Sequence, residues 1–398
     1  MCDRYDLILR NAEVIDPSQE IRQVADLAIL DGRIAALQPS LNNLYGCAEI
    51  DLRGKYLCPG LIDLHGHWYE GSAFGIDPRI CLNHGVTTVV DAGTTGFVNF
   101  AEFQRNQVER SPVRVLGFLN IAGLGIPSVL AGELEDLRYA RPKETAAVLA
   151  AYTSVLLGVK VRIGSTATAG HGMEALRAAL EAATACGLPL MVHISKGANT
   201  AEILKTLRPG DILTHCFQGR GDGLLRAGEL LPEAVEARAN GVFFDVGHGC
   251  GSFSWDVARR AFEHHYYPDT ISTDLHRFSL ERWAIDLPTT MSKFLHLGMS
   301  LEDVILKTTW APARTIRRQT DIGSLRLGTV ADVFVFSLEE GEFLLEDTHL
   351  KVERAARRIK PFLILRAGRV IEPGRCTATI RPLLACDLEL LRYVEETA

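Results

Sequence analysis

The chain has 398 residues, of which 47% are hydrophobic, and its formal net charge is −7 at neutral pH. No run of Lys and Arg is long enough to follow a phosphate backbone, so we expect no nucleic-acid partner, and no stretch approaches the roughly 18 continuous apolar residues of a membrane span. The start of the chain lacks the basic and apolar segments of a signal peptide, and the nine cysteines are scattered, so we expect a cytoplasmic protein with reduced thiols.

The two ends of the chain carry the same pattern of short alternating strands. "LILRNAEVID" (7–16) and "LILRAGRVIE" (363–372) are nearly the same hairpin written twice. We therefore predict one small β-sandwich formed from residues 1–56 and 318–398, with another domain inserted between them. Residues 387–398 are predicted to form a short helix.

Residues 57–317 have a different pattern from the two ends. Apolar strand-like runs alternate with amphipathic stretches of helical spacing. Continuous Val, Ile and Leu runs are typical of parallel strands that are buried on both faces. Eight such runs in this span, close to the ~250 residues of a typical barrel, predict an α/β fold of the TIM-like (β/α)8 class. The runs are 61–67, 86–94, 113–121, 156–164, 189–195, 211–217, 241–249 and 270–276.

Polar residues that can bind metal stand at the ends of five of these strands. Active sites of such barrels lie at the carboxyl ends of the strands, so we expect these side chains to converge on one rim. The first strand has two of them, His65 and His67, which lie on the same face of a strand, about 6.6–6.8 Å apart along it. Each residue alone is weak evidence, but together they predict a metal centre. The six residues are His65, His67, Lys160, His193, His215 and Asp274.

Lys160 is the unusual member of this set. A protonated ammonium would be repelled by a divalent cation, and a neutral amine could bind one ion but could not bridge two. If the amine adds CO2, the carbamate becomes an anionic ligand with two oxygens, and burial next to cations favours the loss of the proton that this addition requires. An ordinary lysine that pairs with Asp274 is the alternative.

The chain resembles the amidohydrolase superfamily through these strand-end residues and through "GLIDLHGH" (60–67), "TTWAPARTI" (308–316) and "GSLRLGTVADVFVF" (323–336). The resemblance implies that one metal is bound by His65, His67 and Asp274. It implies that the other is bound by His193 and His215, and that N6-carboxylated Lys160 and a hydroxide bridge the two ions. Zinc is the metal that we expect, because imidazole and carboxylate ligands suit it.

The branch of the superfamily is indicated by residues near these ligands. Deaminases of this fold tend to carry Glu three residues after the fifth-strand histidine, where this chain has Lys196. Dihydroorotases typically read HxHxR, where this chain has Tyr69 in place of the Arg. The chain is most similar to a dihydroorotase-like subgroup of deacetylases, through "HCFQGRG" (215–221), "FFDVGHGCGSFSW" (243–255), "STDLH" (272–276) and "PTTMSK" (288–293).

The resemblance implies a binuclear hydrolase that removes an acetyl group from a small α-acyloxy or α-acylamino carboxylate. The attack would come from the metal-bridging hydroxide, with Asp274 as the catalytic base. Two alternatives stay open. One is a cyclic amidohydrolase of the dihydroorotase, dihydropyrimidinase or hydantoinase type, and the other is a catalytically silent scaffold.

Further residues are candidates for contacts with this carboxylate substrate. Arg162 shares the face of Lys160 and could hold a carboxylate in a bidentate fork. His276 shares the face of Asp274 by the same rule, and Tyr69 and His248 are additional candidates, with Arg220 as a weaker alternative to Arg162. Barrels of this kind often pair, so a homo-oligomer is also expected.

Overall fold

The computed structural model describes residues 4–42, 45–127, 132–221 and 223–376. The middle of the chain forms a seven-stranded parallel sheet in the order β14-β11-β10-β9-β8-β7-β6. Its strands are buried runs of apolar residues, as parallel strands covered on both faces must be. The bounds are β6 (Leu61–Gly66), β7 (Val86–Ala92), β8 (Arg114–Asn120), β9 (Leu156–Ile163), β10 (Leu190–Ile194), β11 (Ile212–Thr214) and β14 (Phe243–Phe244).

The eighth predicted strand joins the two edges of this sheet through isolated contacts. Parallel bridges connect Asp245 with Thr270 on one side and Gly66 with Leu275 on the other. The segment does not form a regular ladder because Asp274 has a φ of +48°, which interrupts the extended conformation. The sheet is nevertheless closed, so the predicted (β/α)8 class is confirmed, with an irregular eighth strand.

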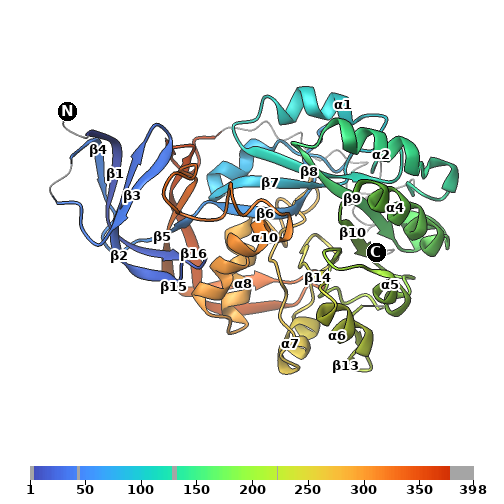
Figure 1. Ribbon diagram of the computed structural model, residues 1–398. Coiled ribbons are helices and arrows are strands. Elements are labelled where there is room, and N and C mark those ends of the chain that lie inside the picture. Colours follow the sequence, from blue (N-terminus) through green and yellow to red (C-terminus); the bar gives the residue numbers. More distant parts are fainter. Residues whose placement is uncertain (1–3, 43–44, 128–131, 222, 377–398) are drawn as a thin grey trace.

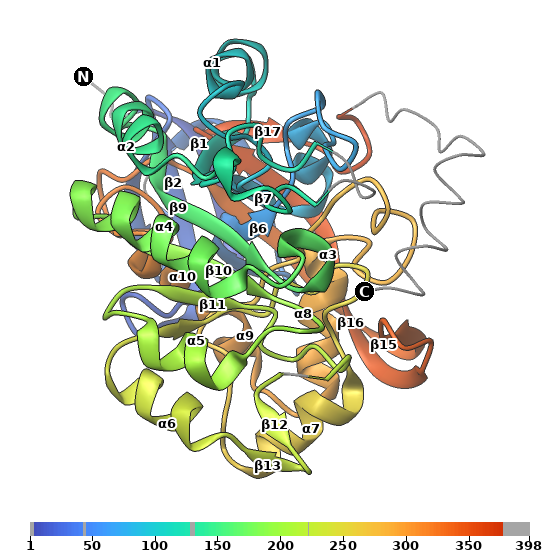
Figure 2. The same ribbon diagram turned by 90° about the vertical axis from the view of Figure 1, so that its right-hand side faces the viewer.

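Helices cover the outside of the curled sheet (Figures 1 and 2). The longest, α4 (Gly172–Cys186), buries alanines and a leucine at helical spacing and packs beside β9. The other helices are α1 (Phe100–Phe103), α2 (Pro142–Ala151), α3 (Ser165–Thr168), α5 (Thr200–Thr206), α6 (Pro232–Ala239), α7 (Trp255–Glu263), α8 (Leu287–His296), α9 (Leu301–Leu306) and α10 (Trp310–Thr315), with short 3-10 or π turns at Pro78–His84, Gln104–Val108 and Leu137–Tyr139.

Strands from both ends of the chain share a second, eight-stranded sheet, hereafter the terminal sheet, which lies beside the barrel (Figure 1). Its order is β17-β16-β15-β5-β1-β2-β3, with β4 paired to β1. Strand β5 joins the two ends, because it pairs in parallel with β1 and antiparallel with β15. The bounds are β1 (Arg4–Asp16), β2 (Ile21–Leu30), β3 (Arg33–Gln38), β4 (Tyr45–Asp51), β5 (Tyr56–Pro59), β15 (Val333–Glu346), β16 (Val352–Arg366) and β17 (Arg369–Ile371).

The composite sheet bears out the prediction that both termini form one small β-structure. The prediction was a β-sandwich, whereas the strands belong to a single hydrogen-bonded sheet. The proposed division into 1–56 with 318–398 and 57–317 stays a prediction, and its first boundary falls within β5. A two-stranded hairpin, β12 (Leu225–Arg226) and β13 (Glu229–Leu230), lies apart from both sheets. The predicted helix at 387–398 lies outside the described residues. Among the helices that are described, none is both long and apolar enough to cross a bilayer.

Candidate metal centre

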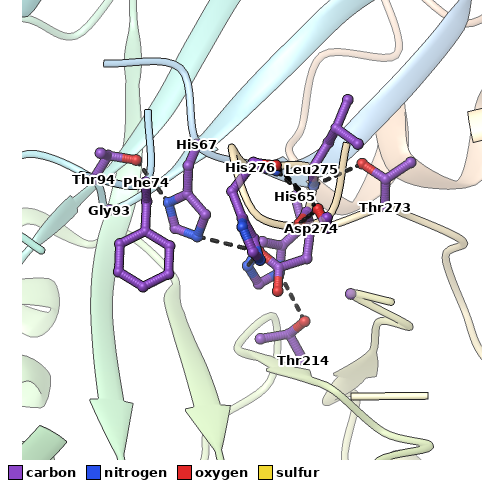
Figure 3. Close-up of polar contacts among 12 residues, drawn as sticks. His65, His67, Phe74, Gly93, Thr94, Thr214, Thr273, Asp274, Leu275 and His276 are labelled. Carbon is purple, nitrogen blue, oxygen red and sulfur yellow. Dashed lines mark hydrogen bonds and ion pairs between the residues drawn. The ribbon is translucent and has the colours of Figure 1, made fainter. Parts of the chain in front are cut away.

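Three of the predicted ligands meet at the carboxyl end of β6. Nε2 of His67 lies 3.1 Å from Oδ1 of Asp274, and Nε2 of His65 lies 3.4 Å from the same oxygen. Figure 3 shows these side chains turned toward one another, and one ligand atom from each falls within 4.8 Å of the others. Nζ of Lys160, from β9, lies 3.4 Å from His65 Nε2, so the lysine faces the same point.

The remaining two histidines complete the group from β10 and the residue after β11. The rings of His193 and His215 have centroids 4.3 Å apart, and the rings of His65 and His215 are 5.0 Å apart. Nε2 of both His193 and His215 is buried and finds no hydrogen-bond partner among the described residues. Buried polar atoms are nearly always paired, so these two nitrogens are suited to bind a cation. The six predicted ligands are therefore brought together.

Hydrogen bonds behind the rings fix which nitrogen faces the centre. Thr214 Oγ1 donates to Asp245 Oδ2 at 2.8 Å, so its oxygen is left to accept from Nδ1–H of His65, also at 2.8 Å. Nδ1 of His67 lies 2.7 Å from Thr94 Oγ1 (Figure 3). With the proton on Nδ1, the His65 Nε2 carries a lone pair, which is the form that binds metal.

His215 is held in the same way, and its backbone is unusual. Nδ1–H of His215 donates to the carbonyl of Gly247 at 2.7 Å, which leaves the lone pair on its unpartnered Nε2. His215 and Asp274 both have positive φ, +65° and +48°. Non-glycine residues adopt this region at a cost and are frequently found at functional sites. Both predicted ligands are thus held in sparsely populated conformations by the surrounding fold.

The electrostatics of the site favour uncharged ligands. Burial lowers the pKa of His67 to about 3 and of His215 to about 4, and it lowers the pKa of His65 and His193 well below the ordinary value. Burial likewise lowers the pKa of Lys160 to about 7, although the charge of Asp274 opposes this shift. The imidazoles are therefore neutral near pH 7, and a substantial fraction of Lys160 is a free amine. Imidazole, carboxylate and amine together fit a divalent transition metal.

A cavity of about 900 Å³, which includes its open mouth, lies over this group. Arg162, His276 and Arg220 line it, as predicted for substrate contacts. Further lining residues that sequence reasoning did not single out for this role are Phe74, Ile126, Thr166, Ile194, Ser195, Lys196, Gln218, Cys250, Gly251 and Ser252.

Two predicted substrate contacts, Tyr69 and His248, are not among the described residues that line the cavity, so these predictions need correction. Strand β6 ends at Gly66, so the alternation of faces does not extend to Tyr69, whose hydroxyl instead donates to Glu102 Oε2 at 2.8 Å. His248 lies between two glycines with positive φ, which turn the chain, and its ring stacks on Phe253 with centroids 4.7 Å apart.

Arg162 has a partner that the sequence did not reveal. Its Nε lies 3.6 Å from Oε1 of Glu133, whose side chain is only 2% exposed, and its guanidinium lies 6.0 Å from the centre of the Phe74 ring. Burial raises the pKa of Glu133, and the charge of Arg162 opposes that rise. Glu133 precedes α2 in a region without strand or helix periodicity, so no pattern in the sequence linked it to the site.

Comparison with known proteins identifies the family of the chain. The sequence model of the amidohydrolase family matches residues 56–370. A deacetylase from Brucella anthropi is 34% identical over 361 residues, which cover 89% of this chain and 89% of the relative. Two crystal structures, described as an adenine deaminase and as a dihydroorotase, are each 31% identical with a TM-score of 0.86. The matches cover 92% and 94% of this chain and all of theirs. On this evidence, the chain belongs to the amidohydrolase family.

Proposed function

We propose that the protein is a binuclear metal hydrolase that removes an acetyl group from a small α-acyloxy or α-acylamino carboxylate. The observation that carries the proposal is the pair of buried Nε2 atoms of His193 and His215, which find no partner among the described residues and lie beside the His65, His67 and Asp274 group. The 34% identity to a protein named deacetylase supports the reaction type.

The residues divide into two sets of ligands. His65, His67 and Asp274 would hold one divalent ion, which we propose is zinc, and His193 and His215 would hold the other. When bound, such ions lower the pKa of water to about 7 and polarise an acyl carbonyl. The neutral state of the imidazoles, which follows from their burial, is the state that these ligands require.

Lys160 would supply the ligand shared by the two ions. Its free amine would form an N–C bond to CO2 and release a proton, which gives an anionic carbamate with two oxygens. The low pKa of Lys160, caused by burial, keeps the amine available for this addition near neutral pH. The position of Nζ beside His65 Nε2 supports a role between the two sets of ligands.

Asp274 is our candidate for the proton carrier. Its Oδ1 makes no hydrogen bond to the described residues and faces the cavity beside both strand-end histidines. A carboxylate in this place can accept a proton from the attacking water and pass it to the leaving oxygen or nitrogen. An amine leaving group depends on this proton more strongly than an alkoxide does, so the role of Asp274 is most visible with amide substrates.

Arg162 would hold the carboxylate of the substrate. Its guanidinium lines the cavity, and Glu133 and the Phe74 ring fix its position. A fixed guanidinium suits bidentate recognition of a planar carboxylate. Phe74, Ile126 and Ile194 line the same cavity, so a small uncharged group of the substrate would contact apolar side chains.

A cyclic amidohydrolase is the second candidate, and the likeness to a structure described as a dihydroorotase favours it. Tyr69 opposes it, because the residue in the place of the dihydroorotase arginine is uncharged and bonds to Glu102. The test is a screen of zinc-loaded, bicarbonate-treated protein on N-acetyl and O-acetyl carboxylates, hydantoin and dihydrouracil. Hydrolysis of the acetylated compounds is the expected result, whereas activity on the cyclic amides alone would overturn the proposal. Protein that binds no stoichiometric zinc would indicate a silent scaffold.

A further inference from the structure

Lys293, in α8, is a completely buried lysine outside the candidate metal centre. Its Nζ lies 2.7 Å from the carbonyl oxygen of Trp283, 2.6 Å from that of Glu346 and 2.7 Å from His248 Nε2. These acceptors come from the segment before α8, the end of β15 in the terminal sheet, and the loop after β14. A lysine has three donors at most, so the side chain is fully engaged and joins three separate parts of the fold.

His248 is suited to accept from this lysine. Its Nδ1–H donates to the carbonyl of Gly249 at 3.0 Å, which leaves the lone pair on Nε2. Burial and the nearby charge of Lys293 keep the pKa of His248 well below the ordinary value, so the ring is neutral. Burial also lowers the pKa of Lys293 to about 7, and the protonated amine supplies the three donors that His248 and the two carbonyls require.

The segment that contains His248, residues 247–253, forms one wall of the cavity and supports Asp274. Its amide groups bond to the eighth barrel segment, from His248 to the Ser272 carbonyl at 3.2 Å and from Gly249 to the Thr273 carbonyl at 2.8 Å. Gly249 has a φ of +53° and lies so close to Asp274 that an added Cβ would overlap the carboxylate oxygen Oδ2. The Asp274 carboxylate is therefore packed directly against the backbone of this segment.

The terminal sheet holds the far end of the same segment. In the turn after β15, Thr348 donates its amide to the Phe253 carbonyl at 3.0 Å and accepts the Phe253 amide on its hydroxyl at 3.2 Å. Asp347 accepts the amide of Trp255 at 3.0 Å. The His248 ring, stacked on Phe253, lies between this support and Lys293.

We propose that Lys293 is a positioning residue for Asp274, which acts through His248 by fixing segment 247–253 against the carboxylate, with the terminal sheet supplying one of its acceptors. The inference rests on the proposed proton-transfer role of Asp274. Displacement of a catalytic group by about 1 Å costs about 100-fold in rate. Because amine leaving groups depend most on proton transfer, loss of Lys293 should slow amide hydrolysis more than ester hydrolysis.

The test compares Lys293→Met, His248→Phe, the double variant and a matched control, Lys307→Met. Lys307 is a partly buried lysine that bonds to the Pro268 carbonyl at 2.6 Å, before the eighth segment begins. The kcat and KM are measured on N-acetylalanine and O-acetyllactate, which differ only in the leaving atom. Thermal unfolding and zinc retained after dialysis are measured for each variant, and His248→Phe, which keeps a stacked ring, carries the test if Lys293→Met does not fold.

We expect both single variants to lower kcat about 100-fold for the amide and about tenfold or less for the ester, with KM nearly unchanged. The kcat of the double variant should be no lower than that of the slower single variant. Folded variants that keep the wild-type ratio of amide to ester hydrolysis, as the control should, would overturn the proposal. If the wild type hydrolyses neither compound, the proposed function fails separately. Zinc retention then tests the role of Lys293. If Lys293 positions Asp274, both single variants should lose zinc faster than Lys307→Met, and equal retention would refute that role.

Discussion

Replacement of Arg162 by Met tests the proposed recognition of the substrate carboxylate. The guanidinium could donate two hydrogen bonds to a carboxylate, and hydrogen bonds to charged groups contribute about 1.5–3 kcal/mol each. A conservative loss of about 3 kcal/mol for the pair corresponds to about a 100-fold decrease in kcat/KM. We expect this decrease to come mainly from KM for an acetylated carboxylate and to be small for its neutral methyl ester.

The same substitution affects Glu133, which would lose the guanidinium at 3.6 Å. The pKa of Glu133 is already raised by burial and would rise further, because the opposing charge of Arg162 is gone. Any ionised fraction of Glu133 would repel the substrate carboxylate. The double variant Arg162→Met with Glu133→Gln removes this repulsion and therefore isolates the contribution of the Arg162 guanidinium. Steady-state kinetics on the matched acid and ester provide the assay. Equal losses for acid and ester in the double variant would show that Arg162 does not bind the substrate carboxylate.

Three other tests concern the proposed metal ligands. Lys160→Ala should lose both bound metal and activity. Added short carboxylic acids should restore part of both, because their oxygens replace those of the carbamate. Metal content and hydrolysis rate are measured, and a fully active variant would speak against the bridging role. Asp274→Asn should stay folded by circular dichroism but lose turnover by orders of magnitude, since an amide cannot carry the proton. At a constant concentration of dissolved CO2, reactivation of metal-free protein by zinc should slow by about tenfold per pH unit below about pH 7, because Lys160 becomes protonated and cannot add CO2. The pKa of His67, about 3, keeps that side chain neutral over this range. A pH-independent rate between pH 5 and 8 would contradict this assignment.

Much of the ligand group could be predicted from sequence because its members stand at or just beyond the ends of predicted parallel strands. Residues at the ends of parallel strands meet at one rim, and the period of two puts His65 beside His67. Tyr69 was a candidate because it stands where dihydroorotases carry arginine, but it lies beyond the end of β6 at Gly66 and does not line the cavity. His248 does not line it either, and it follows a glycine with a φ of +48°.

Other parts of the site depend on contacts between distant segments, and these carry no local signal. Glu133 meets Arg162 from a loop without periodicity, and Lys293 meets His248 across 45 residues of chain. The terminal sheet was visible as a repeated strand pattern at both ends. The predicted hairpin is present only at the C-terminal end, because residues 7–16 lie within the single strand β1. The pairing of β5 with β1 and β15 was not visible. Such pairings are set by packing of the whole fold, which a single sequence does not display.

The most direct test of the account is a crystal structure of the protein saturated with zinc and treated with bicarbonate, with the metals located by anomalous scattering. We predict two zinc ions per chain, one beside His65, His67 and Asp274 and the other beside His193 and His215, with density for a carbamate on Lys160 between them. An unmodified Lys160 with no bound metal under these conditions would contradict the proposed mechanism.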